Sequence, residues 1–386
     1  MLAITASTAV SAMGIGAAAT LAAMRERRSG LRPNDFDNGG GWIGRVAAIE
    51  AHRLPSDLAA FDCRNNRLAD LALRTDGFDQ AVRGAVVRYG ADRIAVVVGT
   101  STSGVLSCEE AYVNRDADGA LPAGFDYDHT HDMFSAARYV RTALGLRGPA
   151  FVVSTACASS AKSFIDAHHL IAAGLCDAAV VGGVDTLCRM TLQGFAALDL
   201  VSPTPCRPCD AARAGISIGE AGGFALVERG EGPLQVLGWG ASSDGYHMSS
   251  PHPDGAGAAA AMQEALATAK LPASAVDYVN LHGTGTRAND AMEDTAVAAV
   301  FGPDTACSST KGWSGHTLGA CGILAAVIAG QCVAHGFVPG CLDIDTVDPA
   351  FRAQVLTENV NRPIRRVALN SFGFGGVNCC LILGVG

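Results

Sequence analysis

Three short segments combine a reactive side chain with small neighbours, and a fourth is a glycine-rich loop. The first is VVSTACASSAKSF, where Cys157 stands among alanine, serine and threonine. The apolar run before it predicts a strand, and the apolar spacing after it predicts a helix with Cys157 in the first turn. Unpaired backbone N–H groups and the positive end of the helix dipole would stabilise a thiolate there. Cys157 is therefore a candidate nucleophile. The alternative is an inert thiol, since free cysteine is among the most buried residue types.

The second segment is LHGTGT, in which a histidine follows an apolar run. A histidine followed by glycine can stand in an open cleft, and the hydroxyls of Thr284 and Thr286 can hold an amide-bearing substrate arm. The alternative for His282 is a structural histidine satisfied in the core. Asp290 and Glu293 lie three residues apart on the helix predicted to follow, and we expect them to cap or pair structurally.

The third and fourth segments lie toward the C-terminus. STKGWSGHTLGACG places Lys311 five residues before His316 and leads into a very apolar stretch. A lysine and a histidine beside a buried helix form a polar island, which proteins rarely maintain without use. In NSFGFGGVN three glycines flank Phe374, so this loop can turn tightly or swing as a gate with Phe374 as its apolar stopper.

The surrounding pattern predicts the elements that must position these side chains. Short β-branched runs such as RIAVVVGTS, AAVVGGV and RVALNSFG alternate with alanine-rich helical stretches. This alternation predicts an α/β fold whose sheets are covered on both faces. The glycine and proline of RGEGPL predict a connector at 230–233, dividing the chain into halves 1–230 and 231–386. Each half contains a strand that runs into a small-residue loop with chemistry in it.

The composition and net charge of the chain argue against some classes of function. The 386 residues are 49% hydrophobic and 17% charged, which indicates a folded chain with a large core. A formal net charge of −9 argues against a broad nucleic-acid surface, because such binding needs many lysines and arginines. Any acidic partner needs a local basic patch. Two apolar stretches, 2–24 and 317–342, resemble membrane segments, but interrupting polar residues and glycines favour a strand with a helix and a buried core helix. We expect no membrane span.

Cysteine usage indicates a reducing compartment. Thirteen cysteines at irregular spacing do not form the framework of a disulfide-rich secreted domain, so we expect a cytoplasmic protein. Cys206 and Cys209 form a CxxC, but the chain has no second CxxC, and no histidine pair follows it at the distance typical of a zinc finger. We expect no metal site.

Together, Cys157, His282, Lys311, His316 and the Phe374 loop resemble the β-ketoacyl-acyl carrier protein synthases, in the elongating Cys-His-His branch. The resemblance runs nearly end to end and includes CRPCDAARAGISIGEAGG and SSDGYHMSSPHPDGAG. The wording of these segments is similar to that of bacterial synthases that build aryl polyene chains.

The resemblance implies a thiolase fold, with two similar βαβαβαββ-type halves stacked as five αβαβα layers. It implies a decarboxylative Claisen condensation that extends a fatty acid or polyene chain by two carbons. The protein would bind no cofactor of its own, because phosphopantetheine arrives on the acyl carrier protein. The expected partners are that carrier protein and a second chain, either an identical copy or a related synthase-like chain.

The resemblance also implies roles for individual residues. Cys157 would hold the acyl thioester, with the backbone N–H groups of Cys157 and Phe374 as oxyanion donors. His282 and His316 would stabilise the enolate left by decarboxylation, and Lys311 would order the polar network. The substrate arm would contact the following residues: Thr284, Thr286, Phe372, Gly373 and Gly375. The loop from Asp244 to Pro251 would open together with the glycine-rich loop.

Four further positions carry expectations. Arg64 and Arg67 match a basic pair that contacts the acidic carrier protein in relatives. Thr102 is expected near the acyl pocket, where it replaces a larger apolar residue and would alter chain selection. Ala325 stands where many relatives carry a glutamate that pairs with the lysine of the motif, so Lys311 is expected to lack that partner.

Other functions use parts of the same site. A chain-length-factor-like partner subunit is the main rival, but such partners usually lack the nucleophile. A malonyl decarboxylase or acyltransferase would use the same residues for partial reactions. A hydrolase is the unrelated alternative, and the chain has no GxSxG motif.

Overall fold

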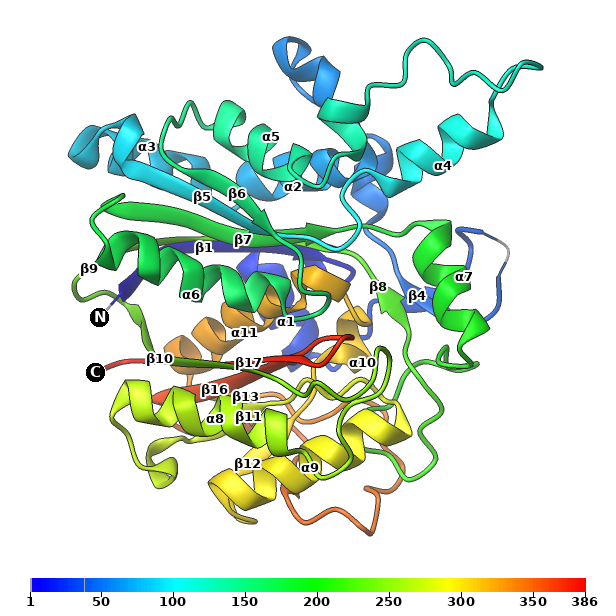
Figure 1. Cartoon of the computed structure of the whole chain (residues 1–386). Helices are drawn as coiled ribbons and strands as arrows, with labels where there is room; N and C mark the ends of the chain where they lie inside the picture. The colour runs from blue at the N-terminus through cyan, green and yellow to red at the C-terminus, as the bar shows by residue number, and fades with distance from the viewer. Residues whose placement is uncertain (1, 38) are drawn as a thin grey trace.

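The computed structural model describes residues 2–37 and 39–386, and it stacks helices and sheets in five layers (Figure 1). Three helices cover the outer face of the first sheet: α2 (Arg64–Leu73), α3 (Phe78–Tyr89) and α5 (Ser135–Ala143). The central layer contains α1 (Ala17–Arg25), α6 (Ser159–Ala172) and α11 (Cys321–His335). The outer face of the second sheet is covered by α8 (Ala256–Ala269) and α9 (Arg287–Phe301). This is the αβαβα arrangement expected of a thiolase fold.

Strand order shows that the two halves repeat one topology. The first half contributes β1 (Leu2–Ser11), β5 (Ile94–Gly99), β6 (Ala150–Val153), β7 (Ala178–Asp185) and β9 (Ala221–Arg229), in the spatial order β6-β5-β7-β9-β1. The second contributes β10 (Leu234–Ser243), β11 (Tyr278–Asn280), β12 (Ala306–Ser308), β16 (Arg366–Phe372) and β17 (Val377–Gly384), in the order β12-β11-β16-β17-β10. In chain order both are third, second, fourth, fifth, first.

The pairing directions repeat as well. In each half the third, second and fourth strands run parallel, and the fourth, fifth and first pair antiparallel. β9 ends at Arg229 and β10 begins at Leu234, so the repeat divides within the four residues between them. Leu2–Ile4 of β1 also pairs with Leu234–Val236 of β10, which joins the two layers at one corner.

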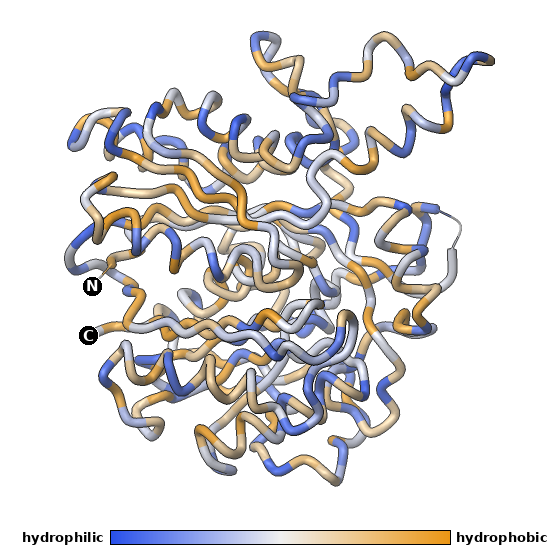
Figure 2. Tube along the Cα trace, viewed as in Figure 1, coloured by the Kyte–Doolittle hydropathy of each residue, from blue (hydrophilic) through white to orange (hydrophobic). Residues whose placement is uncertain are grey.

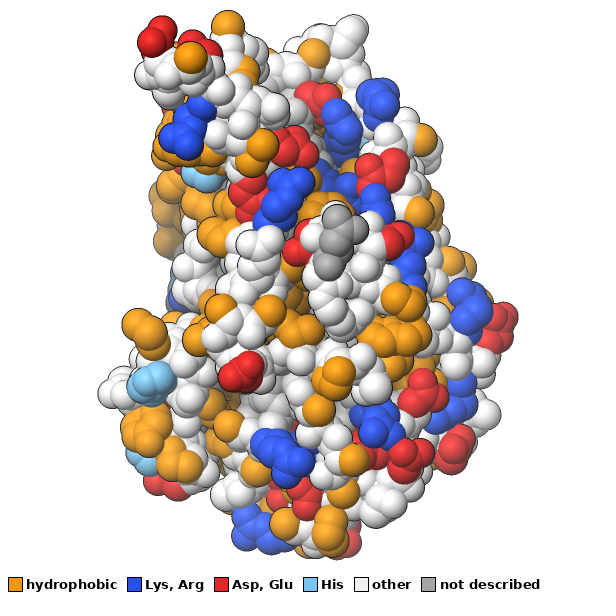
Figure 3. All heavy atoms as spheres, turned by 90° about the vertical axis from the view of Figure 1, so that its right-hand side faces the viewer, with side chains coloured by type: hydrophobic (Ala, Val, Ile, Leu, Met, Phe, Trp, Pro, Cys, Tyr) orange, Lys and Arg blue, Asp and Glu red, His pale blue; other side chains and the backbone are white. Residues whose placement is uncertain are grey.

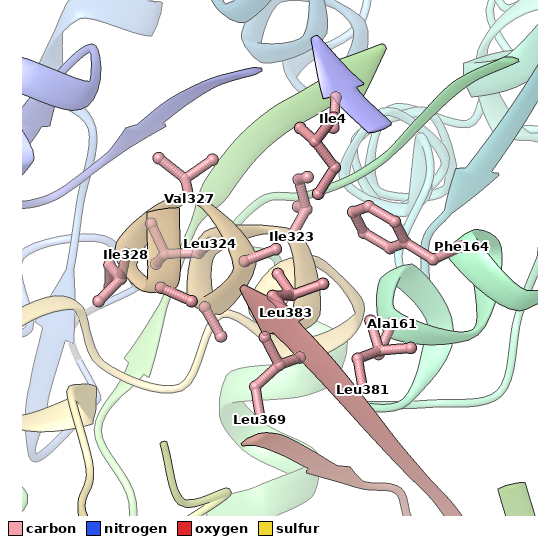
Figure 4. Packing of buried hydrophobic residues seen from close by; sticks show 14 of the residues in the cluster. Ile4, Ala161, Phe164, Ile323, Leu324, Val327, Ile328, Leu369, Leu381 and Leu383 are labelled. Carbon is pink, nitrogen blue, oxygen red and sulfur yellow. The ribbon is translucent and has the colours of Figure 1, made fainter. Parts of the chain in front are cut away.

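Three apolar cores fill the spaces between the layers. The hydropathy trace shows apolar residues concentrated along the strands and inner helices (Figure 2). Close parallel strands covered on both faces require such continuous apolar runs, and all six residues of β5 are buried. In the central core, Ile323 of α11 points toward Phe164 of α6, and Leu381 of β17 belongs to the same cluster (Figure 4).

The apolar segment that passes a membrane-span test on length and composition, Leu318–His335, contains α11. Its helix lies between the two sheets with buried side chains on every face, as expected for a core helix (Figure 1). Gly322 lets α11 approach α6, because a Cβ there would lie 2.4 Å from the backbone nitrogen of Ala161.

The remaining elements lie around this core. The short strands are β2 (Gly14–Ile15), β3 (Leu31–Pro33), β4 (Trp42–Gly44), β8 (Ile218–Gly219), β13 (Phe337–Val338), β14 (Gln354–Val355) and β15 (Val360–Asn361). The remaining helices are α4 (Val105–Val113), α7 (Arg189–Ala197) and α10 (Lys311–Ser314). Short 3₁₀ helices lie at 47–50, 56–61, 91–93, 273–275 and 318–320, and a π-helical turn lies at 127–131. The segment that joins α4 to α5 projects from the body (Figure 1).

Candidate active site

Cys157 lies between β6 and α6, but the helix starts later than the sequence pattern predicts. α6 begins at Ser159 with Ala158 as its N-cap, so Cys157 precedes the first turn. Ala156 occupies the left-handed region with φ of 49°, and the Ser159 hydroxyl donates to the Ala156 carbonyl at 2.6 Å. This turn, which residue spacing does not reveal, sets Cys157 just outside the helix.

The Cys157 thiol is nearly enclosed, with 5% of the residue exposed. Burial raises the pKa of this thiol to about 12, while Lys311 and the backbone N–H of Phe374 act in the opposite direction. The expectation of a stabilised thiolate is therefore wrong for this conformation, because desolvation outweighs the local positive groups. The resting side chain is a neutral thiol that must lose its proton as it attacks.

The two histidines lie next to the thiol. The ring centroids of His282 and His316 are 5.2 Å apart with their planes nearly perpendicular, and one ligating atom from each histidine and the sulfur of Cys157 all lie within 4.8 Å of one another. Burial and the neighbouring Lys311 lower the pKa of both imidazoles well below the usual value. Both rings are therefore neutral at pH 7, and each has one N–H donor.

Hydrogen bonds assign that donor to Nε2 in both rings. The Nζ of Lys311 lies 3.5 Å from Nδ1 of His282 and also donates to the His282 carbonyl. An ammonium group only donates, so Nδ1 of His282 accepts and its proton sits on Nε2. Nδ1 of His316 accepts from the backbone N–H of Leu318 at 3.2 Å, which gives the same tautomer. The site thus contains two Nε2–H donors beside one thiol.

Lys311 has no carboxylate within ion-pair distance in the part of the chain described, residues 2–37 and 39–386. Ala325 is buried on α11 and offers only a methyl group. The carbonyl and ring of His282 satisfy the ammonium instead. Lys311 therefore positions His282 directly.

Two buried carboxylates hold the His282 loop, as the sequence analysis expects. Glu293 accepts the backbone N–H groups of His282 and Gly283, each at 2.7 Å, and Nδ2 of Asn370 at 3.0 Å. Asp290 accepts from the backbone of Thr284 at 2.9 Å. Burial raises the pKa of Glu293 to about 7, although these donors oppose that rise. The role of Glu293 and Asp290 is to fix the backbone of the His282 loop.

A cavity of about 380 Å³ opens onto this constellation. Its lining includes the following predicted residues: Cys157, His282, Thr284, Thr286, His316, Phe372, Gly373, Phe374 and Gly375. Lys311 stands behind His282 rather than on the cavity wall. The structure therefore brings the four segments to one site.

Thr102 is not among the described residues that line this cavity, and its expected place beside the acyl pocket stays a prediction. It is buried, and its hydroxyl donates to Asp185 at 2.8 Å. Asp185 lies at the end of β7 and also accepts from Thr100 and from the backbone of Gly319, which belongs to the second half. Thr102 thus helps to fasten the two halves together beneath the site.

The Phe374 loop is in contact with both the nucleophile and a second loop. Gly373 passes so close to the Cys157 turn that a Cβ would lie 2.7 Å from the Thr155 carbonyl oxygen. Gly375 donates its N–H to the Met248 carbonyl at 2.8 Å. Phe374 is 37% exposed, and its ring centroid lies 5.2 Å from that of Phe195 on α7. The two loops are thus linked, and Phe374 rests on an aromatic neighbour.

Phe195, Cys321 and Asp185 are among the residues at this site that sequence reasoning did not find. Phe195 is one apolar residue among many on its helix, and only the fold shows that it meets Phe374. Cys321 donates its thiol to the Cys157 carbonyl at 3.1 Å from 164 residues away. Asp185 ends an apolar run, AAVVGGVD, and a carboxylate at the end of a buried strand is the signal that would have drawn attention to it.

The predicted basic pair is not a free basic surface. Arg64 does not offer a free guanidinium to a docking partner, because its side chain is 9% exposed and forms ion pairs with Glu220 and Glu50, both at 2.7 Å. Arg67 is more open, at 27%, but both its Nε and Nη2 donate to Asp62 at 2.6 Å. Sequence spacing does not show these acidic partners, since Glu220 lies 156 residues from Arg64.

The repeated fold and the Cys-His-His site together define a condensing enzyme. Family models match as the beta-ketoacyl synthase N-terminal domain over residues 67–232 and the beta-ketoacyl synthase C-terminal domain over residues 234–345. The chain belongs to the β-ketoacyl synthase family. It is an acyltransferase-class enzyme that condenses acyl and malonyl thioesters.

Particular relatives are similar over most or all of the chain. Nodulation protein E of Rhizobium leguminosarum bv. trifolii is 34% identical, covering 96% of this chain and 95% of the relative. The 3-oxoacyl-[acyl-carrier-protein] synthase 2 of Rhizobium meliloti is 38% identical over 62% of this chain and 61% of its own. A solved structure of the ketosynthase ApeO with its chain length factor ApeC, from Xenorhabdus doucetiae, matches with TM-score 0.92 and 37% identity over 100% of this chain and 98% of that one.

Proposed function

We propose that Cys157 carries the growing acyl chain as a thioester while His282 and His316 promote decarboxylation of the malonyl extender. The observation that supports this assignment is the compact group of one thiol and two neutral imidazoles, in which the sulfur and one nitrogen from each ring lie within 4.8 Å of one another. The group faces a cavity that Thr284 and Thr286 also line. A neutral imidazole donates a hydrogen bond without adding a charge.

In the first half-reaction, the sulfur of Cys157 attacks the acyl carbonyl of a carrier-bound thioester. The carbon–sulfur bond to pantetheine breaks, and the released pantetheine sulfur takes up the proton that the thiol loses. The carbonyl oxygen gains negative charge and is stabilised by the backbone N–H groups of Cys157 and Phe374. A thiol whose pKa is about 12 needs this coupled proton transfer, because very little thiolate exists at pH 7.

In the second half-reaction, malonyl thioester loses carbon dioxide and leaves an enolate. The Nε2–H groups of His282 and His316 donate to its oxygen, and Lys311 holds His282 in the required tautomer. The enolate carbon then attacks the acyl carbonyl on Cys157, and the cysteine sulfur leaves and takes up one proton from solvent. The product is a β-ketoacyl thioester two carbons longer.

The relatives support a proposal for the pathway and the partner. The solved ketosynthases that resemble this chain at 37% and 27% identity are each described with a chain length factor. We infer that this chain is the catalytic member of such a pair in a cytoplasmic aryl polyene pathway, served by an acyl carrier protein that brings its own phosphopantetheine. Cys157, His282 and His316 are all in place, which supports the catalytic role over the partner role.

The test is a product analysis. The purified protein, with any chain that copurifies, is incubated with acyl and malonyl carrier proteins, and the products are weighed by mass spectrometry. A β-ketoacyl carrier protein supports the proposal. Carbon dioxide without condensation would indicate a decarboxylase, free acid a hydrolase, and no reaction a non-catalytic partner, and each of these results contradicts it.

A further inference from the structure

One wall of the cavity follows a single stretch of chain from the reactive centre to the surface. His282, Thr284, Thr286 and Arg287 all line the cavity. His282 is 2% exposed and Thr284 is 6% exposed, whereas Thr286 is half-buried and Arg287 is exposed. Exposure thus rises steadily along the wall, so the wall leads outward from the thiol to the mouth.

The chemistry of the wall changes in the same direction. Next to the imidazole of His282 come two hydroxyls, since Oγ1 of Thr284 lies 3.0 Å from Oγ1 of Thr286. These hydroxyls can donate to and accept from amide groups of a ligand. Arg287 follows with a guanidinium, which suits a phosphate oxygen pair. The wall presents, in order, a reactive end, an amide-binding middle and an anion-binding end.

Arg287 has the charge that this role needs. It is the only lysine or arginine among the described residues that line the cavity, and the two histidines there are neutral. No described carboxylate lies within ion-pair distance of its guanidinium, among residues 2–37 and 39–386. The charge of Arg287 helps to lower the pKa of Asp348, but the carboxylate of Asp348 already forms an ion pair with Arg213 at 2.6 Å. The Arg287 side chain is therefore available to a ligand.

The other charged groups of the lining do not provide this function. Asp199 and Asp244 are acidic and would repel an anion. Asp244 is engaged by Nδ2 of Asn378 at 2.7 Å and by the backbone N–H of His252 at 3.0 Å. The face that carries α7 shows basic and acidic side chains intermingled rather than one basic field (Figure 3). Recognition of an anion at the mouth must therefore be local.

We propose that Arg287 binds the phosphodiester of the 4′-phosphopantetheine arm at the mouth of the cavity, and so sets how that arm is seated. The inference rests on the proposed function, because it takes the arm of a carrier-bound thioester as the ligand. The arm has its thioester, its amides and its phosphate in the same order as the three parts of the wall. Arg287 is a positioning residue that does not touch the reacting atoms.

The test compares two small thioesters that carry the same acyl group, one on pantetheine and one on 4′-phosphopantetheine. The second-order rate constant for acylation of Cys157 is measured by mass spectrometry. The wild-type protein is expected to prefer the phosphorylated thioester by about tenfold, as for one exposed charge-assisted contact. Arg287→Gln is expected to remove the preference and leave the pantetheine thioester unchanged, while Arg287→Lys retains much of it.

Arg83→Gln is the matched control, because Arg83 is an exposed arginine on α3 at the opposite outer layer (Figure 1). Equal rates for both thioesters in the wild type, or an equal loss for both in Arg287→Gln, would overturn the inference. Absence of acylation by either thioester in the wild type would instead refute the proposed function. The two failures are thus distinguishable.

Discussion

At the scale of single residues, burial decides the chemistry of the site. The same desolvation that raises the pKa of the Cys157 thiol lowers the pKa of both imidazoles. All three groups are therefore uncharged at rest. Lys311 adds to the effect on the histidines and opposes it on the cysteine. The outcome is a neutral site, which suits a reaction whose charge develops on thioester oxygens.

This neutrality predicts how Cys157 reacts with an alkylating agent. Because the pKa is about 12, the fraction of Cys157 present as thiolate grows tenfold for each pH unit below that value. The rate of iodoacetamide modification at Cys157, followed by peptide mass spectrometry, should rise without levelling off up to pH 10. A plateau below pH 9 would show that the resting thiol ionises readily.

Glu293 predicts a second pH effect, on stability. Its folded pKa of about 7 is raised above the ordinary 4.5, so the folded state holds the proton more tightly than the unfolded state. The contribution of Glu293 to the free energy of unfolding is therefore greatest below pH 4.5, falls as the pH rises from 4.5 to 7, and is constant at higher pH. The total loss is about 3 kcal/mol.

The Glu293→Gln variant resembles the protonated side chain and should lack this part of the pH dependence. Thermal melting midpoints of both proteins between pH 5 and 8 give the comparison. The wild-type midpoint should fall relative to that of the variant as pH rises. Parallel curves would contradict the raised pKa.

The identities of the reactive residues were the part of the site that the sequence predicted best. Cys157, His282, Lys311 and His316 could be named from the sequence because each stands in a short segment with distinctive neighbours. Arg64 and Thr102 could not be placed, because their partners Glu220 and Asp185 are distant in the chain.

At the scale of elements, two glycine-dependent approaches bring the segments together. Gly322 sets α11 against α6, and Gly373 sets the Phe374 loop against the Cys157 turn. The sequence indicated the strands and helices by their apolar periods, but it did not show the left-handed Ala156 that moves Cys157 ahead of α6. Local backbone turns depend on tertiary contacts that periodicity does not contain.

The Gly373→Ala substitution tests the approach of the loop. The new methyl group would lie 2.7 Å from the Thr155 carbonyl oxygen, so the loop must move away from the nucleophile. We expect condensation to fall by at least about tenfold, since small displacements of catalytic groups have large effects on rate. Gly194→Ala, on α7 with no atom within 4 Å of the added Cβ, is the control and should keep wild-type activity. Equal rates for all three proteins would contradict the account.

At the scale of the whole molecule, the chain repeats one strand order twice and fastens the halves through buried polar contacts such as that of Asp185 with Gly319. The alternation of strands and helices indicated this α/β architecture, but strand order depends on long-range pairing that local patterns do not encode. One feature lies outside the compact body. The end of α4 and the segment that joins it to α5 expose the apolar residues Tyr112, Val113, Tyr127 and Phe134.

Exposed apolar residues on a projecting segment indicate a contact with another chain. Val113, at the end of α4, is 78% exposed. If the proposed partner chain binds here, we expect Val113→Asp to raise the Kd for assembly by at least about tenfold. Mass photometry over a dilution series measures this. Val87→Asp, at a residue 87% exposed on α3, should leave assembly unchanged. Unchanged assembly in Val113→Asp would place the interface elsewhere.

The central claim is that the acyl chain passes through Cys157, and a pulse-chase measurement on that residue tests it most directly. The protein is loaded from an acyl carrier protein, the acyl mass on the Cys157 peptide is recorded, and malonyl carrier protein is then added. Cys321→Ala, which changes the neighbouring thiol, is the control. The account predicts an acyl adduct on Cys157 that disappears as an equal amount of β-ketoacyl product forms, and no product from Cys157→Ala. Product formation by Cys157→Ala, or product without the adduct, would contradict it.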